Sequence, residues 1–191
     1  MSALRRWVAV AGLFALQILL PSPVEAAVAV GPVVISIPEG FETAQTQKLK
    51  KALITAWTKS ARNSGLKTLL QINVIDLGVR PGKAPTTQEL TVQAEHYLRQ
   101  FLGGIERRRS GFASSPVAHI EIAGLPAARA SWNGSVGGRD TVGVVYCMIV
   151  RNTFAVTLQT QDLGTTPSSG MFAAMRSIEA VTLATDRAGM E

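Results

Sequence analysis

Few residues in this sequence have the type and spacing that catalysis requires. The two histidines, His96 and His119, lie far apart in the chain without a paired spacing, which makes them weak metal ligands. The serines lack a nucleophile elbow, or a lysine or histidine base at a recognisable spacing. No spacing places two carboxylates, such as Asp140 and Asp162, opposite each other. We therefore predict no catalytic residue, no metal site and no cofactor.

The single cysteine, Cys147, lies within the apolar run of residues 142–150. One cysteine can form neither an intramolecular disulfide nor a cysteine-rich zinc site. Its neighbours are all apolar, and no histidine is near it in the sequence. We expect a small buried hydrophobic side chain and not a reactive thiol.

Arginines are the residues that we expect to bind a partner. Three of them are consecutive, and two others lie on or beside a predicted hairpin that also carries Trp132. Arg and Trp are frequent anchors of protein interfaces. The residues that we predict to bind an acidic protein or a lipid headgroup are Arg107, Arg108, Arg109, Arg129 and Arg139.

Two structural explanations compete with that prediction. The run 107–109 also suits a solvated helix end, where cations meet the negative end of the helix dipole. Trp132 alternates with Ala128 and Ala130, which would place it in the core and Arg129 on the opposite face.

The clearest helix signal precedes the arginine run. Thr86 and Glu89 form the pattern of a capping box, and apolar residues then recur at helical spacing as far as Ile105. A second helix is predicted to start at Thr166, with Pro167 in its first turn.

Strands are predicted before and after the long helix. A short strand ends at Pro38, and residues 68–77 alternate between apolar and polar side chains. Residues 43–62 are ambiguous, but the turn signal at residues 62–65 favours a hairpin over a helix. After residue 117 we expect two antiparallel strands, a turn marked by Asn133-Gly134 and Gly137-Gly138, a central strand at 141–150 and a half-buried partner strand.

The first 26 residues have the features of a cleaved secretory signal peptide. Two arginines precede an apolar stretch that ends at prolines, and small residues follow near Ala26. We predict cleavage after Ala26, a single domain at residues 27–185, and a frayed tail at 186–191. A permanent membrane anchor is the alternative, but the apolar run is shorter than a span needs. The expected location is periplasmic or secreted, with no integral membrane segment after cleavage.

The charge balance is basic, with a formal net charge of +6 over 191 residues. A basic surface favours acidic partners. The basic residues are scattered, however, and lack the interleaved aromatic residues of a nucleic-acid groove, so we expect no nucleic-acid binding.

The order of elements predicts an α+β fold with an antiparallel sheet of six or seven strands and helices packed on it. The opening strand ending in IPEGF (37–41), the hairpin ending at 69–78, the long helix and the segment IAGLPAAR (122–129) resemble the PsbP/Mog/DcrB-type superfamily. The later strands and the final helix containing SIE (177–179) fit the same layout. The resemblance implies an α-β-α sandwich that acts mainly as a binding or assembly module.

We therefore expect an exported, non-enzymatic binding or accessory protein. The alternative is an enzyme, such as a hydrolase, whose site is assembled from residues distant in sequence. The two classes differ in what a concave site would contain, because an enzyme needs convergent titratable groups.

Overall fold

Two antiparallel sheets form the protein. The computed structural model describes residues 26–60, 67–78 and 84–185. The larger sheet has eight strands in the order β3-β4-β5-β10-β9-β8-β6, and β7 also pairs with β8. Its strands are β3 (Glu42–Leu49), β4 (Ala52–Ser60), β5 (Lys67–Asp76), β6 (Ser110–Ser114), β7 (Ala118–Ile122), β8 (Leu125–Val136), β9 (Arg139–Val150) and β10 (Phe154–Leu163). The smaller sheet consists of β1 (Ala27–Val30), β2 (Val33–Ser36) and β11 (Thr182–Leu183).

The α+β class and the antiparallel sheet are therefore confirmed, but the predicted count of six or seven strands is too low. Strands β3 and β6 were missed, and the predicted strand that ends at Pro38 forms β2 of the smaller sheet. The side chains of β3 from Gln45 to Leu49 are exposed, and so are most of those of β6, so both strands lack the apolar alternation of a half-buried strand. The ambiguous region forms β3 and β4, and β4 pairs antiparallel with β5, as the hairpin prediction requires. The turn at residues 62–65 lies outside the described residues, as do most of the predicted signal peptide and the tail at 186–191.

Helix α1 (Thr87–Glu106) begins where the sequence predicts. Thr86 is the N-cap, and its hydroxyl accepts from the backbone N–H of Glu89 while the Glu89 carboxylate accepts from the backbone N–H of Thr86. This reciprocal capping box satisfies two N–H groups that a helix start leaves without partners. The helix continues through Gly103 and Gly104, and Arg107 is its C-cap.

Helix α2 (Ser169–Glu179) starts later than predicted. Ser168, and not Thr166, is the N-cap, because its hydroxyl accepts from the N–H of Met171 at 3.2 Å. The buried carboxylate of Asp162 fixes this turn by accepting from the N–H of Ser168 at 2.6 Å and from the Thr68 hydroxyl at 2.5 Å. A contact between distant segments therefore sets the helix start, which local sequence signals did not reveal.

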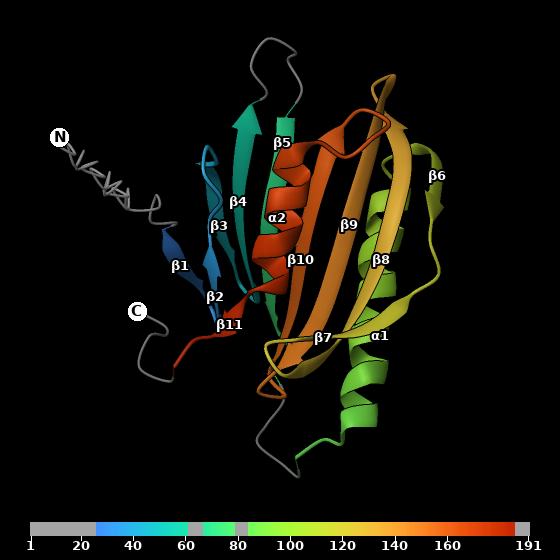
Figure 1. Cartoon of the computed structure of the whole chain (residues 1–191). Coiled ribbons are helices and arrows are strands. Elements are labelled where there is room, and N and C mark those ends of the chain that lie inside the picture. The colour runs from blue at the N-terminus through green and yellow to red at the C-terminus, as the bar shows by residue number, and fades with distance from the viewer. Residues whose placement is uncertain (1–25, 61–66, 79–83, 186–191) are drawn as a thin grey trace, which may run out of the picture.

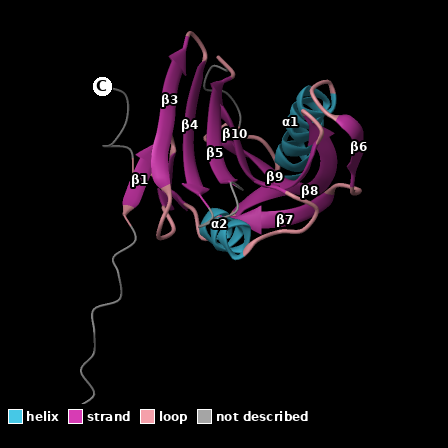
Figure 2. Ribbon diagram, turned by 90° about the horizontal axis from the view of Figure 1, so that it is seen from above, coloured by secondary structure: helices cyan, strands magenta, loops and turns pink. Residues whose placement is uncertain are grey.

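The two helices pack on different parts of the larger sheet. In Figure 1, α2 lies in front of the sheet and α1 behind it, and Figure 2 shows the same arrangement from above. Helix α2 contacts β5 and β10, while α1 contacts mainly β8 and β9. Neither helix among the described residues is long and apolar enough to cross a membrane.

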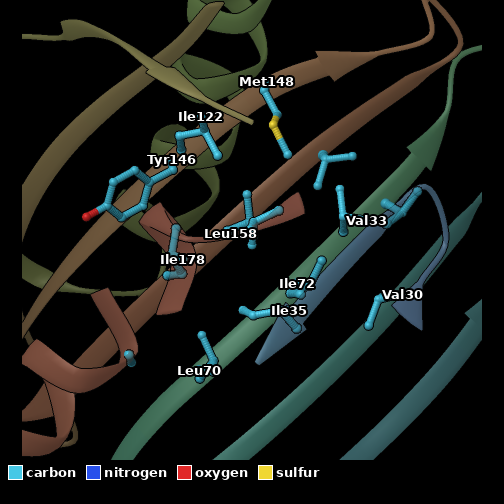
Figure 3. Close-up of a cluster of buried hydrophobic side chains, with 14 of the residues drawn as sticks. Val30, Val33, Ile35, Leu70, Ile72, Ile122, Tyr146, Met148, Leu158 and Ile178 are labelled. Carbon is cyan, nitrogen blue, oxygen red and sulfur yellow. The ribbon is translucent and has the colours of Figure 1, made fainter. Parts of the chain in front are cut away.

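A separate hydrophobic core lies on each side. The α2 side carries the larger core, in which side chains of the small sheet meet those of β5, β9 and β10 (Figure 3). Examples of this core are Ile35, Ile72, Met148, Leu158 and Ile178. The α1 side carries the second core, in which helix residues meet Ala128, Ala130, Trp132, Val145, Cys147 and Ile149. Cys147 is thus a buried hydrophobic side chain, as predicted.

The central strand is β9, which lies between β8 and β10 and is almost fully buried after its first residues. The preceding turn is shorter than predicted, because Asn133 and Gly134 belong to β8 and only Gly137 and Gly138 form the turn. Gly134 lies against Arg109, where a Cβ would stand 3.2 Å from Arg109 Cβ.

Candidate functional site

One face of the larger sheet is only half covered by α1. The strand register aligns residues of β5, β10, β9 and β8 in rows across this face, for example Gln71, Gln159, Val145 and Ala130. Helix α1 covers the β8 and β9 ends of these rows. The β5 and β10 ends form the floor of an open groove beside the helix.

The groove has a volume of about 580 Å³, within the usual range of ligand pockets. Apolar residues line it on both sides: Tyr97 and Phe101 on the helix, and Ile54, Leu69 and Ile75 on the sheet, beside its polar residues. Its floor is polar and comes from two paired strands: Gln71 and Asn73 of β5, and Thr157, Gln159 and Gln161 of β10.

Two floor residues carry buried polar atoms without a partner. Asn73 and Gln159 are 6% and 7% exposed, and neither Asn73 Nδ2 nor Gln159 Oε1 has a hydrogen-bond partner in the part of the chain that the structure describes. The side-chain oxygen of Asn73, Oδ1, does accept a hydrogen bond, from the side-chain amide of Gln71 at 2.7 Å. An unpartnered buried polar group costs about 1–3 kcal/mol. One donor and one acceptor therefore remain without a partner in two residues that line the groove, both almost inaccessible to solvent, so a ligand reaches them only when the two side chains turn toward the groove.

Arg109 is held at one end of the groove by a stack of aromatic and polar contacts. Its guanidinium lies 4.5 Å from the ring centroid of Trp132 and donates to Gln161 Oε1 at 2.8 Å. Burial lowers the pKa of Arg109, and the charge of Arg108 lowers it further, but a guanidinium remains protonated in proteins.

Two glycines make room for this stack. A Cβ at Gly143 would lie 2.3 Å from Trp132 Cζ2, and a Cβ at Gly134 would lie 3.2 Å from Arg109 Cβ. Trp132 thus lies flat over Gly143, beside Gln161 in the same row. The arginine keeps a defined position because both its aromatic support and its acceptor belong to the sheet.

Arg107 and Arg108 extend the cationic end of the groove. Both are exposed and line it, directly after α1 ends. The Arg107 guanidinium lies along the helix surface at Gly103 and Gly104, 3.8 and 3.9 Å from where their Cβ atoms would stand. Among the described residues, no carboxylate forms an ion pair with Arg107, Arg108 or Arg109. Three cations therefore meet at one end of the groove without a protein counter-ion.

The other two candidate arginines lie elsewhere. Trp132 is in the core with Ala128 and Ala130, and Arg129 points to the opposite face, where its guanidinium lies 5.6 Å from the Tyr146 ring. Arg139 is exposed at the start of β9, beside the hairpin turn. The structure thus brings together the run 107–109 and separates it from Arg129 and Arg139. Partner binding by any of the five stays a prediction.

The remaining titratable candidates lie outside the groove. His119 is exposed and lies 2.9 Å from Glu95, and its hydrogen bond is the largest cause of the lowered pKa of that carboxyl, ahead of Arg99. His96 is exposed and contacts Gln100 at 2.9 Å. Within the described residues, no group of three or more His, Cys, Asp or Glu side chains is placed to hold a metal ion.

The polar floor of the groove was not predicted, although both of its strands show polar residues in alternation with apolar ones. Gln71 and Asn73 alternate with core residues of β5, as Thr157 and Gln159 do in β10. This alternation was interpreted only as the solvent side of half-buried strands. The pairing of the two strands would have placed four polar side chains together.

No protein-family model and no curated protein sequence matches the chain. Its fold resembles that of solved structures. LpqN of Mycobacterium tuberculosis, described as involved in cell envelope biogenesis, aligns with a TM-score of 0.51 and 12% identity over 80% of this chain and 83% of LpqN. The Ran-binding protein Mog1p of Saccharomyces cerevisiae aligns with a TM-score of 0.48 and 6% identity over 81% of this chain and 93% of Mog1p. PA94 of Pseudomonas aeruginosa, a protein of unknown function, aligns with a TM-score of 0.41 and 18% identity over 73% of this chain and 82% of PA94.

At these identities the likeness concerns the fold alone. The fold of this chain is similar to that of LpqN over most of both chains.

Proposed function

We propose that this chain is an exported, non-enzymatic binding or accessory protein that captures an acidic partner in the groove beside α1. The observation that carries the proposal is the cationic end of the groove, where Arg107, Arg108 and Arg109 meet without a protein counter-ion among the described residues. Arg109 is held in place by Trp132 and Gln161. A preorganised guanidinium loses less side-chain entropy on binding than a free one.

A non-enzymatic role fits the composition of the groove. The ionisable side chains that line it are the three arginines and Tyr97. Histidines and carboxylates, which most often act as general bases, are placed elsewhere among the described residues. Arginines without such a base are suited to holding an anion.

The proposal includes the architecture and the route of the chain. We propose a single α-β-α sandwich of the PsbP/Mog-like type over residues 27–185, released to the periplasm or the exterior by cleavage after Ala26. The sequence pattern of residues 1–26 supports export, and the description of LpqN as involved in cell envelope biogenesis is consistent with it. Mass spectrometry of the protein recovered from an expressing cell tests the route, with Ala27 expected as the first residue.

A pull-down from an envelope extract at low and moderate salt tests the binding role. The full-length sequence is expressed and the protein is used in the form that the cell produces. We expect a specific acidic protein or lipid to be enriched, more strongly at low salt because exposed charges are screened. The double variant R107E/R108E should lose this enrichment.

K48E/K50E is the matched control, since it reverses two exposed charges outside the groove, and Arg139→Glu tests the candidate arginine at the start of β9. Equal enrichment by the wild type, R107E/R108E and a charge-matched unrelated protein would contradict the proposal. Loss of enrichment in Arg139→Glu alone would assign binding to another surface.

A further inference from the structure

The floor of the groove adds information about the ligand that the arginines alone do not supply. An anion needs only donors, and the arginines provide them. Gln159 Oε1 is an acceptor, however, and Asn73 Nδ2 is a donor, both buried and both without a partner. A ligand that satisfies the floor must therefore offer a donor and an acceptor together.

From this combination we propose that the groove binds a short acidic peptide segment in an extended conformation. Each peptide residue carries one N–H donor and one C=O acceptor, and in an extended chain both point to the same side, which complements the free atoms of Gln159 and Asn73. The carboxylate of the same segment would meet Arg107, Arg108 and Arg109. This inference rests on the proposed function and specifies its partner.

The strand register sets the spacing between the two features. Counted from the arginine end of the groove, the first row contains Gln161, which accepts from Arg109, and the next row contains Gln159. The row after that contains Asn73, which pairs with Thr157. Each step of two residues along a strand spans about 7 Å. An extended peptide has the same repeat, so an amide two to four residues from the acidic side chain would reach the free pair.

The apolar residues that line the groove suit the side chains of such a segment. Tyr97 and Phe101 line the helix side of the groove, and Ile54 and Ile75 lie on the sheet beside Asn73. Successive side chains of an extended peptide point to opposite sides and would meet these two apolar groups. A phosphate or a carboxylate headgroup alone would use the arginines and leave the acceptor of Gln159 unpaired.

The test is an NMR titration of the isotopically labelled protein, expressed from its full sequence, with defined peptide probes. One pool holds N-acetylated, C-terminally amidated tetrapeptides that end in Asp or Glu, and a matched pool ends in Asn or Gln. A third probe is the best binder with an ester in place of the amide two residues before the acidic residue. The readouts are the dissociation constant and the side-chain amide signals of Asn73 and Gln159.

We expect the acidic pool to shift both amide signals and to bind at least tenfold more tightly than the neutral pool. The ester probe should lose affinity by a similar factor, as should Gln159→Met, while Gln88→Met on the exposed first turn of α1 should bind normally. If Gln159→Met proves poorly folded, Asn73→Leu tests the donor instead. Backbone spectra of each variant establish that the fold is intact.

Failure of this inference can be separated from failure of the proposed function. Tight binding of the ester probe with unmoved Asn73 and Gln159 signals would overturn the peptide assignment and leave anion capture standing. The same holds if no peptide binds while inorganic phosphate, vesicles with an acidic phospholipid or an acidic oligosaccharide bind in a manner that R107E/R108E abolishes. Absence of binding by every anionic probe would overturn both.

Discussion

Two halves of one sheet face differ in polarity in this protein. Beneath α1, the residues of β8 and β9 are apolar and almost fully buried, as in Ala130, Val145 and Cys147. In the same rows, β5 and β10 present Gln71, Asn73, Thr157 and Gln159 to the groove. The helix covers only the first half, so the second half would be expected to be polar and well hydrated.

The second half is polar but not simply a solvent surface. Asn73 and Gln159 are more than nine-tenths buried and retain unpartnered atoms. A sheet under no functional demand would gain stability from apolar residues at these positions. The apolar half stabilises the fold, and the unpartnered polar atoms of the second half are the reason for proposing that it holds a ligand.

The largest effect should come from the apolar half. Leu98 of α1 is fully buried in the second core, and Leu98→Ala should lower the free energy of unfolding by about 2–5 kcal/mol. Urea unfolding measures this loss. Val92→Ala, on the same helix but 62% exposed, should change it by less than about 0.5 kcal/mol. Similar values for the two variants would mean that α1 does not seal a core.

A smaller loss is expected where the two halves meet. Gly143→Ala places a Cβ 2.3 Å from Trp132 Cζ2, and such overpacking costs about 1–3 kcal/mol. The displaced indole would also move the support of Arg109. A double-mutant cycle with Trp132→Phe checks the mechanism, because the smaller ring should reduce the cost of Gly143→Ala. Purely additive losses would assign the effect to the backbone.

The pH dependence of stability tests whether solvent is excluded from the core beneath α1, which contains Cys147. Burial raises the pKa of the Cys147 thiol from 9.0 to about 12. Above about pH 9, the unfolded chain releases a proton that the folded chain retains. The free energy of unfolding should then fall with rising pH, by about 1.4 kcal/mol per pH unit for each such group. Below the unfolded pKa the stabilisation is fully present.

Cys147→Ala should reduce this slope between pH 9 and pH 10.5 in urea titrations. A slope will persist in the variant, because burial also raises the pKa of Tyr146. An unchanged slope would show that solvent reaches the thiol in the folded protein.

The polar half should respond in the opposite sense to substitution. Gln159→Met removes a buried acceptor that has no partner, so the free energy of unfolding should rise by about 1 kcal/mol while peptide affinity falls. Thermal and urea unfolding measure the first effect, and the NMR titration measures the second. If Gln159 had a purely structural role, its substitution would lower both the stability of the protein and its affinity for the peptide. A less stable Gln159→Met that still binds would place the free acceptor outside the ligand site.

The fold was largely predictable because its signals are local. The capping box of Thr86 and Glu89 located α1. The alternation in residues 68–77 and 154–159 and the apolar run at 141–150 located the central strands. Strand β3 was missed because its side chains are polar and exposed on the sheet edge. Asn133-Gly134 was misread as a turn because the need for space beside Arg109 arises only in the folded protein.

Only the local part of the candidate site could be predicted from the sequence. The arginine run is visible in the sequence, but its partners Trp132, Gln161 and the two glycines come from three other segments. Arg129 was grouped with it because both are basic, although strand alternation already allowed that they face opposite sides. Which half of a sheet face a helix covers is a tertiary property, so no single strand reveals that Asn73 and Gln159 share a groove.

The smallest change in stability is expected from the residues with the largest expected effect on binding. Arg107 and Arg108 are exposed at the C-terminal end of α1, and R107E/R108E should cost only about 0.3–1 kcal/mol through the helix dipole. Binding of the acidic peptide should nevertheless fall at least tenfold, and its salt dependence should weaken because fewer cations contribute. Affinity measured at two salt concentrations, beside urea unfolding, checks both effects. A variant that retains salt-dependent binding would leave Arg109 as the sole anion contact, whereas a large loss of stability would make these two arginines part of the scaffold.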